Sequence, residues 1–238
     1  MMQSYEILSA MNWNDYYKNK SDRYPGLDIE SRLKAVGKTE FGTPITQTSL
    51  SILKQNILNL LGKCSNFSRF IDLGCGTGII TENVLTYLSG KETYLFDPSV
   101  DNITKCEILF AKEQNVYCKV GDHTQALQYI NANTVLLAYE VVQHISHENL
   151  EIFIKKLFEF NVKKIIFGGV PDIERRELFF TGRDYKPDLV NQSDEIIGYW
   201  YKPVFFFNVL KHGYNTYIFE QGELYTSKYR FDVVIERE

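Results

Sequence analysis

The sequence contains only four cysteines, and they follow no recognisable pattern. Cys64, Cys75, Cys106 and Cys118 form no C-x-x-C pair and none of the spacings that hold a metal ion. A disulfide framework is typical of small secreted domains, whereas reduced thiols are typical of the cytoplasm. We therefore expect four reduced thiols in a cytoplasmic protein, and no metal site.

Long apolar runs and a surplus of basic residues are also absent. The N-terminus lacks the basic start and apolar core of a signal peptide, and no apolar run is long enough to span a bilayer. The 26 Lys and Arg against 30 Asp and Glu give a formal net charge of −4, which argues against a general nucleic-acid-binding protein. We expect a small-molecule partner and no membrane span, and the sequence makes no prediction of oligomeric state.

Apolar segments and helical patterns alternate through the middle of the chain. A length of 238 residues suits one large domain. Predicted strands lie at 67–73, 91–99, 115–122, 133–140 and 162–170. Helical patterns at 78–89, 100–113 and 146–160 separate them, which indicates βαβ units and a parallel sheet. The last of these patterns places Leu150, Phe153, Ile154, Leu157 and Phe158 on one face. A helix predicted at 48–63, before the first strand, ends at Gly62. After a last helix at 202–213, predicted strands at 214–221 and 228–236 would add an antiparallel pair to one edge.

Glycine is concentrated in the segment RFIDLGCGTGII, residues 69–80. Gly74, Gly76 and Gly78 follow the first predicted strand and open the next helix, where backbone N–H groups favour an anionic group or a close backbone contact. No Gly-Lys-Ser/Thr follows, which rules out a Walker A loop. The dinucleotide fingerprint G-x-G-x-x-G also fails, because its third position is Ile79.

Acidic residues at the ends of the next two strands indicate a nucleoside ligand. Asp97 ends the second strand, 19 residues after Gly78, where a carboxylate can accept the hydroxyl groups of a ribose. The alternative is that Asp97 caps the following helix. Asp122, in GDHT after the third strand, could accept an adenine amino group.

With these motifs the sequence resembles the class I S-adenosylmethionine-dependent methyltransferases over residues 48–170. The likeness rests on the segments IDLGCGTG, LFDPS, GDHT and LLAYEVVQHIS. It implies a Rossmann-like, doubly wound sheet of seven strands, mostly parallel with an antiparallel C-terminal strand and helices on both faces. The C-terminal sequence further resembles small methyltransferases of bacterial capsule and other surface-polysaccharide biosynthesis.

The resemblance also implies which residues contact S-adenosylmethionine. The glycines surround the methionine portion, Asp97 the ribose, and Asp122 with His123 the adenine. The cofactor-binding residues implied are Asp72, Gly74, Cys75, Gly76, Thr77, Gly78, Asp97, Pro98, Ser99, Gly121, Asp122, His123 and Tyr139, with Tyr17 and Tyr24 from an N-terminal segment that folds over the site.

The segment after the fourth strand carries the candidate catalytic residues. Tyr139 and Glu140 stand at a strand end beside the expected sulfonium, with His144 one turn later. A neutral imidazole suits removal of a proton from a hydroxyl acceptor near pH 7, and we expect the rate to fall at acid pH with an apparent pKa near 6–7, roughly. The alternative is that His144 caps a short helix. Related enzymes often carry a second acid where this chain has Gln143, so a metal site is not expected.

We predict one methyltransferase domain, with residues 1–47 as a cap, 48–170 as the cofactor-binding core and 171–238 as the acceptor side. The leading acceptor is an oxygen of a sugar or of a phosphorylated or phosphoramidate capsule precursor, which Arg175, Arg176 or Arg183 could hold if it is anionic. The alternatives are N-methylation of a small molecule or a tRNA base, and a binding module that performs no transfer.

Overall fold

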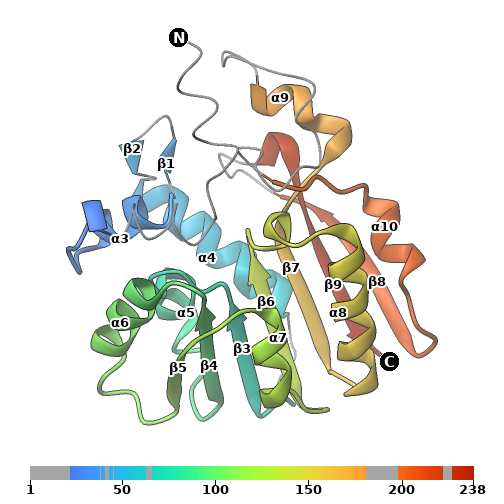
Figure 1. The fold of residues 1–238 in the computed structure, drawn as a ribbon, viewed down its shortest axis with the longest axis horizontal. Helices are drawn as coiled ribbons and strands as arrows, with labels where there is room; N and C mark the ends of the chain where they lie inside the picture. The colour runs from blue at the N-terminus through green and yellow to red at the C-terminus, as the bar shows by residue number, and fades with distance from the viewer. Residues whose placement is uncertain are drawn as a thin grey trace.

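A seven-stranded β-sheet runs through the centre of the molecule in the computed structural model (Figure 1). The structure describes residues 22–37, 39–40, 43–44, 46–62, 66–180, 198–221 and 227–238. The strands of the sheet are β3 (Arg69–Leu73), β4 (Glu92–Asp97), β5 (Val116–Val120), β6 (Thr134–Tyr139), β7 (Lys164–Pro171), β8 (Tyr214–Glu220) and β9 (Arg230–Arg237). Two short strands, β1 (Thr39–Glu40) and β2 (Thr43–Pro44), pair separately.

The order of the strands is β5-β4-β3-β6-β7-β9-β8. Neighbours from β5 to β7 pair in parallel, and β9 runs antiparallel to both β7 and β8. The chain moves outward from β3 to β5 and then returns to place β6 on the other side of β3. This reversal is the switch point at which open α/β sheets bind ligands. The predicted fold class is confirmed.

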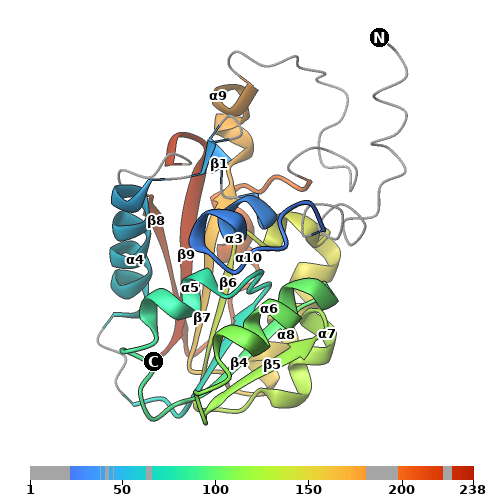
Figure 2. The same ribbon diagram turned by 90° about the vertical axis from the view of Figure 1, so that its left-hand side faces the viewer.

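Helices cover both faces of the sheet (Figure 2). On one face, α4 (Gln47–Leu61), α5 (Ile79–Val84) and α6 (Val100–Leu109) pack against residues such as Phe70, Val135 and Leu95. On the other face, α7 (His123–Ala126), α8 (His147–Glu159) and α10 (Pro203–Asn208) pack against residues such as Ile71 and Phe167. Apolar burial on both faces explains why the central strands β6 and β7 are buried along their whole length and are almost entirely apolar.

The two longest helices begin and end where their sequences predict. Thr46 caps α4 by accepting a hydrogen bond from the Ser49 amide, and Gly62 ends it with a φ of 61°. Ser146 caps α8, which buries the five apolar residues expected on one face: Leu150, Phe153, Ile154, Leu157 and Phe158. Helix α5 is shorter than the predicted pattern and ends at Val84, with turns up to Gly90. None of the helices in the described ranges is both long and apolar enough to cross a bilayer.

Candidate functional site

The glycine loop lies at the carboxyl end of β3, next to the end of β6. The amides of Gly74 and Cys75 donate to the carbonyl of Phe96 on β4, at 2.7 and 2.9 Å. Gly74 has a φ of 69°, and a Cβ added there would lie 2.3 Å from a methyl group of Val141. Only glycine combines this backbone conformation with so close an approach. The loop therefore sits at the switch point, as the sequence predicts.

Asp72 lies beneath the loop rather than in it. Its side chain is buried, and Oδ2 accepts a 2.6 Å hydrogen bond from the hydroxyl of Thr81 on α5. This bond ties the end of β3 to the helix that follows the glycines. The geometry gives Asp72 a role in holding the loop.

Asp97 is buried at the end of β4, and both of its carboxylate oxygens accept hydrogen bonds. Oδ1 accepts from the amide of Ser99 at 2.9 Å and from Nδ2 of Asn102 at 3.1 Å. Oδ2 accepts from the amide of Gly76 at 2.9 Å. Burial raises the pKa of Asp97, and these three hydrogen bonds oppose the rise. Asp97 thus joins the glycine loop to β4. Among the described residues, Oδ2 accepts the Gly76 hydrogen bond and has the capacity to accept one more.

The helix cap that the sequence left open for Asp97 belongs to Ser99. The Ser99 hydroxyl accepts from the amide of Asn102 at 3.3 Å and begins α6. Pro98, between them, is exposed, and Ser99 is buried.

Helix α3 (Ile29–Ala35) packs against the glycine loop. The guanidinium of Arg32 is buried, lies 2.6 Å from Glu82 on α5 and donates to the carbonyl of Thr77 at 3.4 Å. The hydroxyl of Thr77 donates back to the carbonyl of Arg32 at 3.3 Å. The carbonyl of Tyr24 accepts from Lys105 of α6 at 2.8 Å, and Tyr17 lies outside the described residues. Arg32 is a cation at the loop that the sequence alone did not single out.

Asp122 and His123 begin α7 at the end of β5. Oδ1 of Asp122 accepts from the amides of Thr124 and Gln125 in a capping box. Although burial opposes it, the hydrogen bonds from Thr124 hold the pKa of Asp122 below its usual value. His123 packs edge-on against Phe153, and burial lowers its pKa. The amide of Gly121 donates to the carbonyl of Asp97 at 3.0 Å, so this segment lies beside the end of β4.

Tyr139 and Glu140 end β6, where the backbone takes an unusual conformation. Glu140 has a φ of 57°, a left-handed conformation that non-glycine residues adopt rarely and often at functional sites. Tyr139 is buried, and its hydroxyl accepts a 3.2 Å hydrogen bond from Nε2 of Gln221. The two residues lie together at the switch point, as predicted.

His144 ends a short 3-10 helix, Val142–His144, and its environment differs from the expectation. Burial and the charge of Arg230 lower its pKa to about 3, although Glu140 opposes the shift. The expected titration near pH 6–7 was wrong, because the sequence did not show that the ring is enclosed beside a guanidinium. His144 is not a cap of this short helix either, because its N-cap is Val141 and its C-cap is Ile145.

Three residues of the C-terminal strand pair reach the same place and were missed in the sequence. All three are buried and lie where β8 ends and β9 begins: Gln221, Arg230 and Asp232. Oε1 of Gln143 accepts from Arg230 at 3.4 Å. The sequence did contain a signal, because Arg230 and Asp232 are charged residues on a strand whose other residues up to Ile235 are apolar.

Arg175, one of the three arginines that could hold an anionic acceptor, is already paired. Arg175 donates to both carboxylate oxygens of Glu220 at 2.5 Å and lies 3.3 Å from Asp172. Arg176 begins α9 (Arg176–Phe180), and Arg183 lies outside the described residues. Arg175 therefore contributes no uncompensated positive charge to this side.

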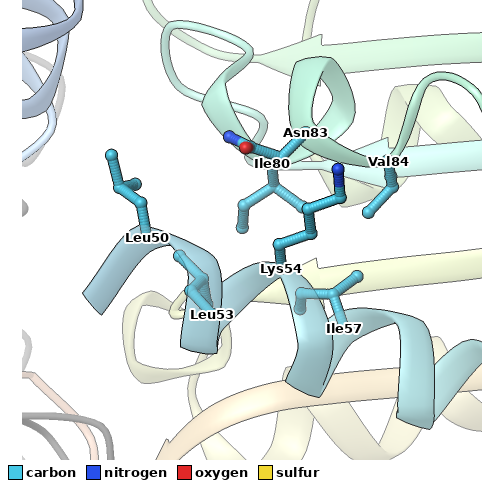
Figure 3. Close-up of a pocket in the computed structure, with 7 residues that line it drawn as sticks. All are labelled: Leu50, Leu53, Lys54, Ile57, Ile80, Asn83 and Val84. Carbon is cyan, nitrogen blue, oxygen red and sulfur yellow. The ribbon is translucent and has the colours of Figure 1, made fainter. Parts of the chain in front are cut away.

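An apolar recess lies away from this edge, between α4 and α5 (Figure 3). Its lining consists of Leu50, Leu53, Lys54, Ile57, Ile80, Asn83 and Val84. Its polar groups are the amine of Lys54 and the amide of Asn83, and its lining holds no carboxylate, imidazole, hydroxyl or thiol.

The thiols and the acids of the described residues form no metal site: no group of three or more His, Cys, Asp or Glu side chains there could hold an ion. Cys75, Cys106 and Cys118 are free. Burial raises the pKa of Cys75 to about 12, so the thiol in the glycine loop is protonated and unreactive.

No protein-family model and no curated protein sequence matches the chain. Solved structures do match it. Magnesium protoporphyrin IX methyltransferase ChlM from Synechocystis PCC 6803, crystallised with bound SAH, has a TM-score of 0.56 and 14% identity over 95% of this chain and 98% of its own. A SAM-dependent methyltransferase from Leishmania major has a TM-score of 0.61 and 14% identity over 98% of this chain and 89% of its own.

The bifunctional kinase-methyltransferase WbdD is a further structural neighbour. It has a TM-score of 0.52 and 14% identity over 80% of this chain and 39% of its own. Likeness at these identities is a likeness of fold. The chain has the fold of the SAM-dependent methyltransferases.

Proposed function

We propose that this chain binds S-adenosylmethionine and transfers its methyl group to a small-molecule acceptor. The observation that carries the proposal is the bond between the Gly76 amide and Oδ2 of Asp97, at the switch point of the sheet. It joins the loop that would surround the methionine portion to the carboxylate that would accept a ribose hydroxyl. In this proposal residues 1–47 cover the cofactor, 48–170 bind it and 171–238 form the acceptor side.

The described residues offer groups suited to each part of the cofactor. Oδ2 of Asp97 can accept a ribose hydroxyl, and Asp122, whose capping bonds fall on Oδ1, can accept the adenine amino group with Oδ2. Arg32, which is paired with Glu82, donates to the carbonyl of Thr77 and so holds the loop that would surround the methionine portion. Asp97 is a buried, hydrogen-bonded carboxylate at the carboxyl edge of the sheet. A carboxylate there can accept the hydroxyl groups of a nucleoside in strong, charge-assisted hydrogen bonds.

Bound S-adenosylmethionine would supply a methyl group already activated by its sulfonium leaving group. The chain then has to align the acceptor and exclude water. Tyr139 and Glu140 would orient the acceptor, and His144 would accept a hydrogen bond from its hydroxyl. Because the pKa of His144 is about 3, the imidazole is neutral at pH 7 and is a weak base. Alignment is therefore the main contribution of these residues.

For the acceptor we propose an oxygen of a sugar or of a phosphorylated or phosphoramidate capsule precursor. The support is the likeness of the C-terminal sequence to methyltransferases of surface-polysaccharide pathways. Because Arg175 is paired with Glu220, a phosphate of the acceptor would have to be held by other groups, such as Arg176, Arg183 or backbone amides.

Calorimetry with S-adenosylmethionine, its demethylated product S-adenosylhomocysteine, NAD and ATP tests the cofactor. We expect both sulfur nucleosides to bind and NAD and ATP to bind much more weakly. Equal or tighter binding of NAD would contradict the proposal.

A further inference from the structure

Strand β7 contains a bulge beside Tyr139 and Glu140. Phe167 pairs with Val233 and Val170 with Phe231, so Gly168 and Gly169 together face one residue, Asp232. A bulge leaves a backbone amide without a partner in the sheet and re-aims nearby side chains, often next to active sites. Here the partner is a side chain: Oδ1 of Asp232 accepts from the Gly169 amide at 2.7 Å.

The two glycines make room for the residues that end β6. A Cβ added at Gly168 would lie 2.2 Å from the ring of Tyr139, and one at Gly169 would lie 2.6 Å from Cγ of Glu140. The amide of Glu140 donates to the carbonyl of Gly168 at 2.7 Å. The bulge and the left-handed Glu140 therefore form one unit.

Gln221 connects Asp232 to the hydroxyl of Tyr139. Its Nε2 lies 2.8 Å from Oδ1 of Asp232 and 3.2 Å from Oη of Tyr139. An ionised carboxylate only accepts hydrogen bonds, so Gln221 presents its NH₂ group to Asp232 and to the phenol. The phenol oxygen therefore accepts this hydrogen bond from Gln221.

Arg230 completes the unit from the same face of β9. It donates to the carbonyl of Gly169 and to Oε1 of Gln143. Burial raises the pKa of Asp232, while the Gly169 and Gln221 bonds and the charge of Arg230 oppose the rise. Asp232 and Gln221 are both nearly inaccessible to solvent, so their bonds persist without competition from water.

From this geometry we propose that Asp232 and Gln221 are positioning residues for methyl transfer, acting through Tyr139 and the Gly168–Gly169 bulge. They fix the direction of the Tyr139 hydroxyl and hold Glu140 at the carboxyl end of β6. The C-terminal strand pair is thus part of the reaction site as well as of the sheet. This inference rests on the proposed function, because it places the methyl donor beside Tyr139.

A fluorine probe at Tyr139 tests the inference without an acceptor. The variant carries 3-fluorotyrosine at position 139 alone, and its ¹⁹F resonance is recorded with and without S-adenosylhomocysteine. We expect the resonance to move on addition of the nucleoside. We also expect Gln221→Leu and Asp232→Ala to shift the resonance in the free protein. Asp232→Asn should keep the resonance close to its original position, because an amide oxygen still accepts both hydrogen bonds. The control Asn215→Ala, on the exposed face of β8, should leave the resonance unchanged.

The outcomes separate the inference from the function on which it rests. A resonance that ignores Gln221→Leu in a folded protein would overturn the positioning role. That role also fails if calorimetry detects the nucleoside but the fluorine does not respond to it, and the proposed cofactor would then stand. Absence of nucleoside binding by calorimetry would instead remove the proposed function. Should Asp232→Ala fail to fold, Gln221→Leu and Asp232→Asn still decide the question.

Discussion

Three buried carboxylates near the carboxyl edge of the sheet differ in what they hold. Asp72 fixes α5 through Thr81, Asp97 fixes the glycine loop, and Asp232 fixes the bulge. Each satisfies a donor that its turn or loop would otherwise leave unpaired, which is costly inside a protein. Asp97 differs from the others in its position at the end of β4, beside the predicted ribose.

Replacing Asp97 should weaken the binding of S-adenosylhomocysteine. Hydrogen bonds to charged groups contribute about 1.5–3 kcal/mol, so Asp97→Ala should raise the dissociation constant at least about tenfold. The Gly76 amide also loses its acceptor, so the melting temperature should fall. Asp101→Ala, which removes the same charge from α6, is the control. An unchanged dissociation constant in a folded Asp97→Ala protein would leave Asp97 with a structural role alone.

His144 should make stability depend on pH. Its pKa is about 3 in the folded protein and about 6.5 when unfolded, so the unfolded state binds more protons between these values. The stabilisation from the neutral ring is complete above pH 6.5 and is lost as the pH falls toward 3. From pH 7 to pH 5 the free energy of unfolding should drop by about 1–2 kcal/mol more than in His144→Gln. Urea denaturation at the two pH values measures the difference, and equal losses would contradict the burial of the ring.

Among the secondary-structure elements, α3 connects the N-terminal region to the glycine loop. Arg32 joins it to Glu82 on α5 and to the carbonyl of Thr77, and Leu33 packs against Leu50 and Ile79. In Figure 1, α3 and the β1–β2 pair lie on the left, above the carboxyl ends of the parallel strands β3 to β5. We propose that this helix is part of the segment that covers the cofactor.

Loss of the Arg32 contacts should loosen the loop. Arg32→Met keeps the apolar stem but removes the charge, and we expect a loss of about 1–3 kcal/mol in stability. Amide exchange of Gly76 and Gly78 should become faster. Lys34→Met on the same helix removes an exposed pair with Glu30 and should leave the stability nearly unchanged. Unchanged exchange in Arg32→Met would show that α3 does not restrain the loop.

Across the molecule, the alternation of apolar strands and amphipathic helices was enough to predict the sheet. Periodicity also gave the buried face of α8, and turn residues gave the end of α4 at Gly62. The glycines and strand-end acids predicted a ligand at one edge of the sheet, because the carboxyl ends of parallel strands meet there.

Residues brought in from distant segments were not predictable in this way. The bond from Gln221 to Tyr139 joins positions 82 apart, and Arg32 reaches Thr77 across 45. No local pattern encodes such pairs, since they depend on how segments far apart in the sequence pack together in the fold. The double glycine at 168–169 was a local sign of the bulge, because glycine within a strand often marks one.

Binding of S-adenosylmethionine at the end of β3 is tested most directly by a crystal structure with S-adenosylhomocysteine. We predict density for the nucleoside along the glycine loop, with a ribose hydroxyl on Oδ2 of Asp97 and the sulfur beside Tyr139. Density in the recess between α4 and α5, or a ribose away from Asp97, would contradict the proposed binding mode.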